Sequence, residues 1–430
     1  MKKQKNLLII YPHWHPVNLA GVHRPRLTGN FLKEFAWKPI VLSVDEKYYE
    51  EQPDPDFCKT FSDDFEVHRV GALPLTRPRM IGDIGLRAFF HLYFGALKLM
   101  RSRPIDFVWI PIPSFYCALL GRLLWHKTKI PYGIDYIDPW VRDITGRNDW
   151  RHKLSNKLAR ILEPIAVQKA SLITGVSYEY YKPVLERNFK PKVTSPLTLH
   201  SSPFTISHSP FPYGFDPNDH RLKLPYINYP WPDKGVKPWI YAGAFLPNSR
   251  LFVVEMFEAI AELRKEGIWD EAVQMYFVGT GAYPGESILD YAKDSGIADI
   301  VFEDRNRFPF LHVLNYLSAA DTVMVIGSTE KHYTASKVYQ ALLSGRPVWA
   351  VFHEESSAVQ VMKECKADHF LIEYKEGMYL QELRNAMKDS LLCRLEQKEW
   401  NPDLYALDKY SARESARKLA EAMELLIGEG

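Results

Sequence analysis

The segment 333–348, which reads Tyr-Thr-Ala-Ser-Lys-Val-Tyr-Gln-Ala-Leu-Leu-Ser-Gly-Arg-Pro-Val, carries residues that could bind an anion. Its apolar side chains recur at helical spacing and would face a core, while Ser336 and Gln340 share another side that is free to bind. Thr334 or Ser336 can cap the helix, so that the first amide groups point at an anion, to which Lys337 adds a mobile cation. Pyrophosphate suits such a place. The structural alternative is an ordinary capped helix with a solvated lysine.

The loops of the first half carry a second group of polar residues. His13 and His15 lie in a proline-rich loop, where they could ligate a metal, but no carboxylate lies nearby in the sequence to complete such a site. Gly21 and Arg24 follow, and we expect them to meet phosphate or sugar oxygens. Asp138 ends a later apolar run, where it could accept a hydrogen bond from a sugar hydroxyl or activate an acceptor. Capping of a turn is the structural alternative for this carboxylate.

Two glycines follow an apolar run in the second half. Gly279 and Gly281 permit a close approach of the backbone to a ligand. Their spacing is not the full Gly-x-Gly-x-x-Gly of dinucleotide folds, because Gly285 comes one place late, so a plain dehydrogenase is disfavoured. We assign no Asp-x-Asp motif to metal binding, and we expect neither a metal nor a cofactor.

Short apolar runs alternate with helical patterns along the chain, which is typical of βαβ units around parallel sheets. We therefore expect an α/β protein with two sheets, each of which presents the carboxyl ends of its strands to a ligand. Helices are predicted over 251–265 and 337–344. The predicted strands are 7–11, 39–44, 65–70, 107–112, 131–137 and 171–176, and then 239–243, 273–279, 300–302, 322–326 and 347–352.

A proline-rich stretch between the two groups of strands marks the domain boundary. Eight prolines lie between positions 203 and 238, and they prevent helix continuation and remove donors from strand ladders. We therefore predict an N-terminal domain at 1–203, a linker at 204–237 and a C-terminal domain at 238–407. The segment 408–430 is predicted to be a closing amphipathic helix, from the spacing of Leu419, Ala420, Met423 and Ile427.

Composition excludes several classes of protein. The 430 residues suffice for two ordinary domains. Lys and Arg number 54 against 52 for Asp and Glu, a balance too even to indicate nucleic acid as the main partner. The four cysteines are far apart, and no export signal or membrane span is recognisable, so we expect a cytoplasmic protein.

The segment 77–103 combines an apolar stripe with basic residues. Such a helix can lie in a membrane interface while its basic groups meet anionic lipids, which predicts peripheral contact with the inner face of the membrane. The alternative is that the stripe simply faces the core. The stripe consists of Leu86, Phe89, Phe90, Tyr93, Phe94 and Leu97, and the basic residues are Arg77, Arg79, Lys98, Arg101 and Arg103.

Several short motifs follow one another along the chain. They are Gly21–Arg26 with Trp37–Leu42, Asp135–Trp140, Phe211–Asp216, Tyr241–Gly243, Phe277–Gly281, Val301–Arg307 with Leu314–Asp321, and the segment 333–348. In this order they resemble the motifs of family 4 glycosyltransferases, and 333–348 looks like the donor-site helix of that family. The resemblance covers most of the chain, and the order and spacing of the motifs make it specific.

The resemblance implies a GT-B fold, in which two Rossmann-like domains face a cleft and the last helix returns to the N-terminal domain. It also implies retaining transfer of a sugar from a nucleotide-sugar to a hydroxyl of a sugar or lipid-linked acceptor in polysaccharide or glycolipid synthesis. The lack of a metal-ligating Asp-x-Asp motif favours a reaction without a metal. Arg250 and Lys337 would then counter the charge of the departing diphosphate. The other residues placed near the nucleotide-sugar are Gly243, Gly279, Arg307, Ser336 and Gln340.

One departure from the family pattern concerns two glutamates, spaced eight positions apart, of which the second accepts hydrogen bonds from the donor ribose. The matching positions here are His332 and Gln340. Gln340 can still exchange hydrogen bonds with hydroxyls, but no carboxylate remains. Two alternatives therefore stay open: a GT-B-like subunit that binds nucleotide-sugar without turnover, and a nucleotide-sugar epimerase.

Overall fold

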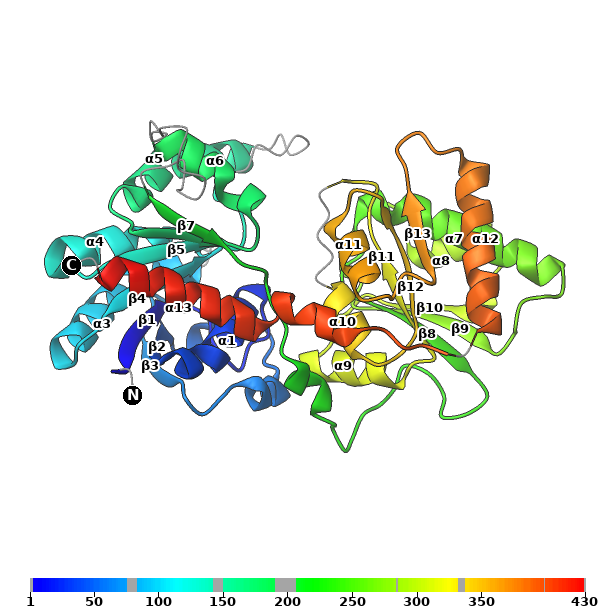
Figure 1. Cartoon of the computed structure of the whole chain (residues 1–430), viewed down its shortest axis with the longest axis horizontal. Helices are drawn as coiled ribbons and strands as arrows, with labels where there is room; N and C mark the ends of the chain where they lie inside the picture. The colour runs from blue at the N-terminus through cyan, green and yellow to red at the C-terminus, as the bar shows by residue number, and fades with distance from the viewer. Residues whose placement is uncertain are drawn as a thin grey trace. The chain divides into compact units, whose positions relative to one another are not determined.

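The computed structural model describes residues 3–75, 83–141, 150–189, 206–283, 285–331, 337–397 and 399–428. The chain forms two compact units. Unit 1 contains Met1–Asp216 and Tyr410–Gly430, and unit 2 contains Pro217–Lys409. Each unit is built on its own parallel sheet with helices around it, as the alternation of apolar runs and helical patterns predicts (Figure 1).

The sheet of unit 1 has seven parallel strands in the order β3-β2-β1-β4-β5-β6-β7. Its central strands are apolar along their length because helices cover both faces of the sheet. Leu8 of β1 pairs with Ile40 on one side and with Val108 on the other. The strands are β1 (Lys5–Ile10), β2 (Trp37–Val44), β3 (Glu66–Val70), β4 (Phe107–Ile112), β5 (Tyr132–Tyr136), β6 (Leu172–Gly175) and β7 (Ser207–Pro210).

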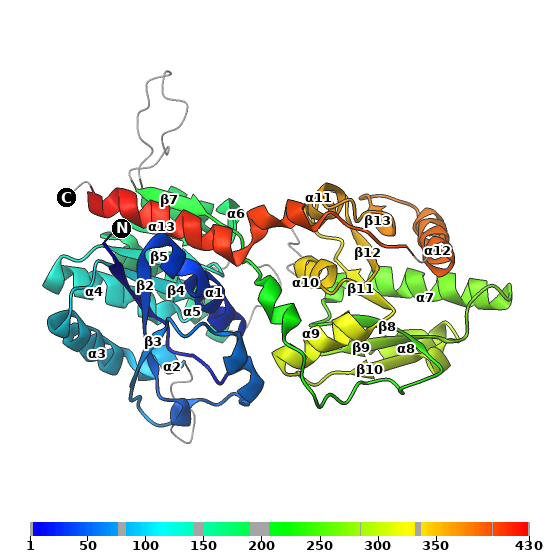
Figure 2. The ribbon, with the colours of Figure 1, turned by 60° about the horizontal axis from the view of Figure 1, so that its bottom comes forward.

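Two helix layers cover this sheet. Right-handed crossovers place α1 (Ala20–Phe31) on one face, and α3 (Phe89–Ser102), α4 (Ala118–Thr128) and α5 (Trp150–Val167) on the other. In the second layer α4 contacts both α3 and α5. In the first layer α13 (Ala412–Gly428), at the end of the chain, lies along α1 (Figure 2). Two further helices of unit 1 are α2 (Ile84–Arg87) and α6 (Tyr178–Asn188).

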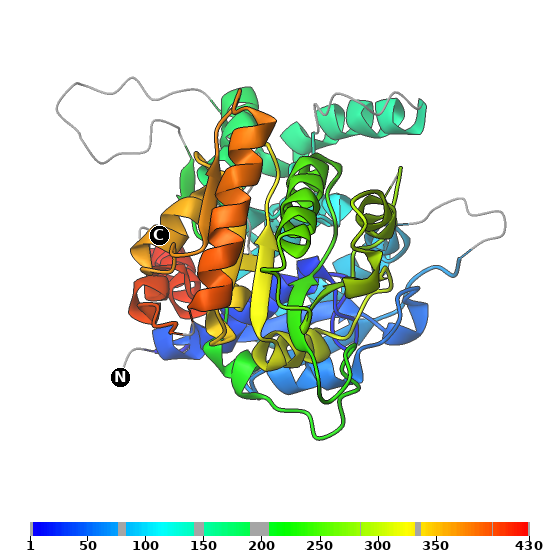
Figure 3. The same ribbon diagram turned by 90° about the vertical axis from the view of Figure 1, so that its right-hand side faces the viewer.

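The sheet of unit 2 has six parallel strands in the order β10-β9-β8-β11-β12-β13, the same pattern as the first six strands of unit 1. Two of its helices, α7 and α12, pack side by side (Figure 3). The strands are β8 (Lys237–Ala242), β9 (Val273–Val278), β10 (Val301–Asp304), β11 (Thr322–Ile326), β12 (Val348–His353) and β13 (Leu371–Tyr374). The helices are α7 (Arg250–Lys265), α8 (Ile288–Asp294), α9 (Phe310–Ala319), α10 (Lys337–Leu343), α11 (Ser357–Glu364) and α12 (Leu380–Glu396).

Two strands appear that the sequence patterns do not indicate, and both lie at sheet edges. The proline-rich stretch contains the edge strand β7, whose last residue is Pro210. A proline is tolerated there because the sheet does not need its missing N–H group for a hydrogen bond. The chain then passes from unit 1 to unit 2 between Asp216 and Pro217, inside the segment 204–237. The other edge strand, β13, has four residues, too few for a clear pattern. None of the described helices has an apolar run long enough to cross a bilayer.

Candidate functional site

The strand order of unit 2 reverses between β8 and β11. In open α/β sheets, ligands bind outside the carboxyl ends of the strands at such a reversal. Here β8 leads into Gly243 and β11 leads into Gly327, whose N–H group donates to the carbonyl of Val351 at 2.8 Å. The chain beyond β11 leads to α10, which begins at Lys337. The predicted donor-binding residues therefore belong to the loops and helices at this end of the sheet.

The ammonium group of Lys337 is held against the end of β8. Its Nζ donates to the hydroxyl of Tyr241 at 2.8 Å and to the carbonyl of Ala244 at 3.0 Å, and it lies 4.6 Å from the centre of the Tyr241 ring. Burial lowers the pKa of Lys337 from 10.5 to about 8, because the charged form loses hydration. Within the described chain, no carboxylate forms an ion pair with this lysine. An anion bound here would therefore interact with an uncompensated positive charge.

Gly243 makes room for that ammonium group. Its φ is +123°, a conformation that residues with a side chain rarely adopt. A Cβ atom at this position would lie 2.6 Å from Cε of Lys337. The N–H group of Gly243 donates to the carbonyl of Val278 at 2.8 Å, which ties the turn to β9. The backbone conformation therefore favours glycine, and the flexible end of the Lys337 side chain fills the space where a Cβ would lie.

Gly279 begins the neighbouring loop, with a φ of +71°. A Cβ on Gly279 would lie 3.8 Å from the backbone nitrogen of Gly243, so the two turns are adjacent. The loop is fastened by Glu303, which accepts hydrogen bonds from the hydroxyl groups of Thr280 at 2.6 Å and Tyr283 at 2.7 Å. Burial, followed by the bond to Glu303, raises the pKa of Tyr283 and keeps its hydroxyl a donor. This loop is thus a defined wall of the site.

Arg250 begins α7 with its side chain in solvent. Its Nη2 lies 2.8 Å from Oε2 of Glu286, and the guanidinium lies 5.0 Å from the centre of the Tyr291 ring. The two charged side chains are 60% and 52% exposed, so this ion pair adds little stability. Arg307, in the loop between β10 and α9, is also exposed. Ser336 lies outside the described residues.

Gln340 is paired with a histidine that no sequence pattern indicates. Nε2 of His220, in the turn Pro217–Arg221, lies 2.6 Å from Oε1 of Gln340. Burial lowers the pKa of His220 to about 4, so the ring is neutral at physiological pH. Its Nδ1 is buried without a partner in the described structure, which places the single N–H of the neutral ring on Nε2. The amide oxygen of Gln340 therefore accepts from His220 and keeps one further lone pair, while its amino group can donate to a ligand.

Unit 1 reverses its strand order between β1 and β4, and the predicted acceptor-side residues follow β1. Nε2 of His13 lies 3.3 Å from Oε2 of Glu51, and this hydrogen bond lowers the pKa of Glu51 to about 2. His15 is half-buried, and burial lowers its pKa. The carbonyl of His15 accepts a hydrogen bond from Arg69 at 2.9 Å. The two histidines thus have separate partners.

Gly21 and Arg24 both lie inside unit 1, in α1. A Cβ on Gly21 would lie 1.7 Å from the hydroxyl oxygen of Tyr11, so this glycine gives room to a buried tyrosine whose pKa is raised by that burial. Arg24 is fully buried, and its Nε and Nη2 each donate to a carboxylate oxygen of Asp135 at 3.0 Å. Its Nη1 donates to the carbonyls of Phe211 and Pro212. We expected Arg24 to meet phosphate or sugar oxygens, but its donors are used within the fold.

Asp138 follows β5 in unit 1 and is half-buried. Burial, and then the charge of Asp138, raises the pKa of the nearby Tyr180. Asp138 precedes Trp140, which stacks on Phe115 with ring centres 5.8 Å apart. Asp138 therefore belongs to unit 1, whereas Lys337 belongs to unit 2.

Asp54 and Asp56 have the spacing of an Asp-x-Asp pair. Asp54 is buried and accepts a hydrogen bond from Asn18 at 3.1 Å, while Asp56 pairs with Lys59 at 2.6 Å. Across the described ranges, no group of three His, Cys, Asp or Glu side chains is arranged to hold a metal.

Solved structures that are similar to this chain are GT-B glycosyltransferases. Sucrose-phosphate synthase from Thermosynechococcus elongatus has 15% identity and a TM-score of 0.55, with 99% of this chain and 98% of that chain covered. Anabaena HepE in complex with UDP and glucose has 14% identity and a TM-score of 0.57, with 98% and 100% covered. Trehalose-6-phosphate synthase has 10% identity and a TM-score of 0.57, with 99% and 98% covered. No known family pattern and no curated protein sequence matches the chain. The likeness establishes a GT-B fold of two Rossmann-like domains.

Proposed function

We propose that the protein is a glycosyltransferase of the family 4 type, which moves a hexose from a nucleotide-sugar to a hydroxyl of an acceptor with retention at the anomeric carbon. The observation that carries this proposal is the position of Lys337. Its ammonium group lies at the strand-order reversal of unit 2, has a pKa lowered to about 8, and forms no ion pair with a described carboxylate. A bound diphosphate would supply the counter-charge that no described carboxylate provides to this ammonium group.

The proposed chemistry depends on the charge that develops on the leaving group. As the bond between sugar and phosphate breaks, negative charge accumulates on the departing nucleoside diphosphate. Lys337 would counter it from a partly desolvated position, where electrostatic interactions are stronger than in water. Arg250 would exchange Glu286 for a phosphate oxygen. With the charge countered by these two cations, we propose a reaction that needs neither a metal nor a protein nucleophile.

The acceptor belongs, in this proposal, to unit 1, where Asp138 and His13 follow the ends of β5 and β1. We propose a sugar or lipid-linked hydroxyl in polysaccharide or glycolipid synthesis. A place at the inner face of the membrane, with contact through 77–103, suits such an acceptor. UDP-sugars are the first donors to test, because UDP is bound in the HepE structure.

A donor screen tests the proposal directly. Thermal unfolding is measured with UDP, GDP and ADP, since a ligand at 100 times its dissociation constant stabilises by about 2.7 kcal/mol. Release of the nucleoside diphosphate is then followed with and without acceptor sugars. Lys337→Met should abolish both effects, whereas Lys293→Met, which removes an exposed lysine paired with Asp290, should leave both intact. Unchanged nucleotide stabilisation in Lys337→Met would remove the basis of the proposal.

The pairing of His220 with Gln340 favours one second candidate, a subunit that binds nucleotide-sugar without turnover. An amide oxygen that already accepts from His220 has one lone pair left for a ribose hydroxyl, fewer than an unpaired carboxylate offers. Saturable binding without acceptor-dependent product in the wild type, together with turnover in Gln340→Glu, would favour this candidate. Turnover in the wild type would exclude it.

A further inference from the structure

The helix α5 carries large apolar side chains on its solvent face. Leu154, Leu158, Ile161 and Ile165 are 49%, 38%, 53% and 40% exposed. Their spacing of four, three and four residues places them in one narrow stripe, because residues of an α-helix advance by about 100° each. Isolated exposed apolar residues are common on protein surfaces, but a continuous stripe indicates a contact.

The stripe is not the core face of α5. The buried residues of this helix, Ala159, Glu163, Ala166 and Val167, lie on the opposite side and pack into unit 1. Glu163 is 1% exposed and accepts a hydrogen bond from Arg187 at 2.8 Å. The outward stripe is therefore not used in the packing of α5 against the rest of unit 1.

Basic residues accompany the stripe. Lys153, Lys157 and Arg160 are exposed along one flank of α5. Lys153 and Lys157 form no ion pair with any described residue. The helices α3, α4 and α5 together contain a single carboxylate, the buried Glu163, although the whole chain has nearly equal numbers of acids and bases. The adjoining helix α6, whose Arg187 pairs with Glu163, carries the exposed Glu179 and Glu186, so the excess of positive charge is confined to α3, α4 and α5.

The neighbouring helix α4 continues the same surface. Nη1 of Arg122 donates to the carbonyl of Ile165 at 3.2 Å, which joins α4 to the end of the stripe, and the adjacent Leu123 is 42% exposed. Near the end of α4, the ammonium groups of Lys129 and Lys169 lie 4.2 and 5.3 Å from the centre of the Trp125 ring. A half-buried tryptophan beside lysines is typical of membrane interfaces.

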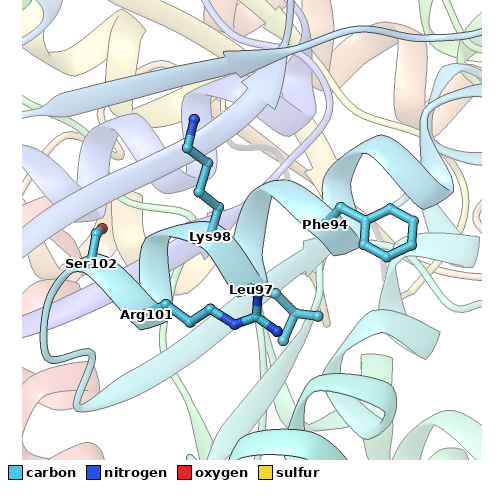
Figure 4. Close-up of a pocket in the computed structure, with 5 residues that line it drawn as sticks. All are labelled: Phe94, Leu97, Lys98, Arg101 and Ser102. Atoms are coloured by element: carbon cyan, nitrogen blue, oxygen red, sulfur yellow. The ribbon is translucent and has the colours of Figure 1, made fainter.

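The third helix, α3, contains most of the stripe expected in segment 77–103, but the structure divides that stripe. The helix breaks at Ala88, Leu97 is buried, and Phe90 and Phe94 are 68% and 63% exposed. Arg77 and Arg79 lie outside the described residues, and Arg103 pairs with Glu66. A shallow surface hollow of about 470 Å³ on α3 is lined by Phe94, Leu97, Lys98, Arg101 and Ser102. Figure 4 shows these five side chains along the helix.

We propose that the outer face of α3, α4 and α5 docks on an anionic phospholipid bilayer, with the stripe of α5 in the interface. Aliphatic side chains would enter the boundary between head groups and acyl chains, and the lysines would reach the lipid phosphates. The hollow on α3 combines apolar walls with two cations, which suits a lipid head group and the start of its chain. This proposal moves the main contact from 77–103 to α5, and it does not require that the protein transfer sugars.

A second copy of the chain fits this face less well. Two α5 helices could pack through stripes of this spacing, but each would present only cations beside the stripe, because the one carboxylate of α5 is buried and already paired. Like charges brought together in this way oppose association, whereas anionic lipids attract them. Charge complementarity therefore favours the bilayer.

Vesicle sedimentation of the full-length protein, without nucleotide, tests the proposal. Vesicles of equimolar phosphatidylglycerol and phosphatidylcholine should bind the protein, and binding should fall as salt is added. Leu158→Glu combined with Ile161→Glu should weaken binding by roughly tenfold or more. Lys153→Glu combined with Lys157→Glu should weaken it by roughly tenfold as well. Leu425→Glu, at a leucine of α13 that is 69% exposed, is the matched control and should bind like the wild type.

Three results would overturn the proposal. The first is equal binding to vesicles with and without phosphatidylglycerol, and the second is that the α5 variants sediment like the wild type. The third is a concentration-dependent dimer in ultracentrifugation that the α5 variants abolish, without vesicle binding by the wild type, which would assign the face to a second copy. Circular dichroism confirms that the variants are folded. Because nucleotide is absent, loss of Lys337 function leaves the measurement unaffected.

Discussion

Replacing Lys337 with methionine should stabilise unit 2, although it removes the proposed contact with the donor. The lysine is charged in the unfolded chain up to its ordinary pKa of 10.5, whereas in the fold its pKa is about 8. At about 1.4 kcal/mol for each pKa unit, the ammonium group destabilises the fold by at most about 3.5 kcal/mol at pH 7. Hydrogen bonds to Tyr241 and Ala244 and partial exposure reduce this value, so we expect a gain of about 1–3 kcal/mol.

The sign of the pH dependence is fixed by the same pKa values. Between pH 8 and 10.5 the unfolded chain binds more protons at this position than the folded chain, so wild-type stability should rise with pH in that window. The advantage of Lys337→Met should therefore be full below pH 8 and vanish near pH 10.5. Methionine leaves the Tyr241 hydroxyl satisfied, because this group donates to the Ala244 carbonyl at 2.8 Å.

Urea unfolding at pH 7, 9 and 10.5 measures this effect. The transition of unit 2 is identified as the one that nucleotide shifts in the wild type, and Lys293→Met serves as the control at an exposed lysine. A gain of 1 kcal/mol should raise the melting temperature of a unit of this size by about 2–4 °C. If Lys337→Met is no more stable than the wild type at pH 7, or if its advantage is equal at pH 7 and 10.5, then the lysine is not a desolvated cation and the reasoning fails.

Three further predictions concern single residues. Arg250→Met should change the free energy of unfolding by less than about 0.5 kcal/mol, yet weaken nucleoside diphosphate binding by roughly tenfold or more in calorimetry. Gly243→Ala should destabilise unit 2 by about 1–3 kcal/mol in urea, because its φ is strained and its Cβ meets Lys337, and equal stability would contradict the tight fit. Asp135→Asn should destabilise unit 1 by about 3–5 kcal/mol, since it leaves the buried Arg24 guanidinium without its counter-charge, and a loss below 1 kcal/mol would refute that role.

The sequence predicts most strands of the fold because central strands of a parallel sheet are buried on both faces. The strands at 107–112 and 322–326 begin and end as the apolar runs predict. The edge strands β7 and β13 escape detection, although β10, an edge strand of the same length, does not. The sequence of β7 is Ser-His-Ser-Pro, which contains no apolar run. The hydrogen bonds that define them depend on a neighbouring strand, which local composition does not reveal.

For the candidate site, the sequence indicates which residues are charged or polar better than it indicates which other residues of the fold they contact. Lys337 and Gly243 are recognisable as a cation and a turn, but their contact joins residues 94 positions apart in the chain. Gln340 is visible as a polar residue on α10, whereas its partner His220 is separated by 120 residues and lies in a segment without a motif. Arg24 looks like a ligand for phosphate until the fold brings Asp135 against it, 111 residues away. Long-range pairing therefore decides which charged residues remain available to a ligand.

The arrangement of α13 has a consequence for biosynthesis. This helix belongs to unit 1, where it lies along α1 and buries Leu419 and Met423, but it is encoded after the whole of unit 2. During translation, the ribosome releases the residues of unit 2 while one side of α1 still lacks its cover. Unit 1 therefore closes only after the last helix has left the ribosome. A chain truncated near residue 410 would keep the whole of unit 2 but would leave this side of α1 uncovered.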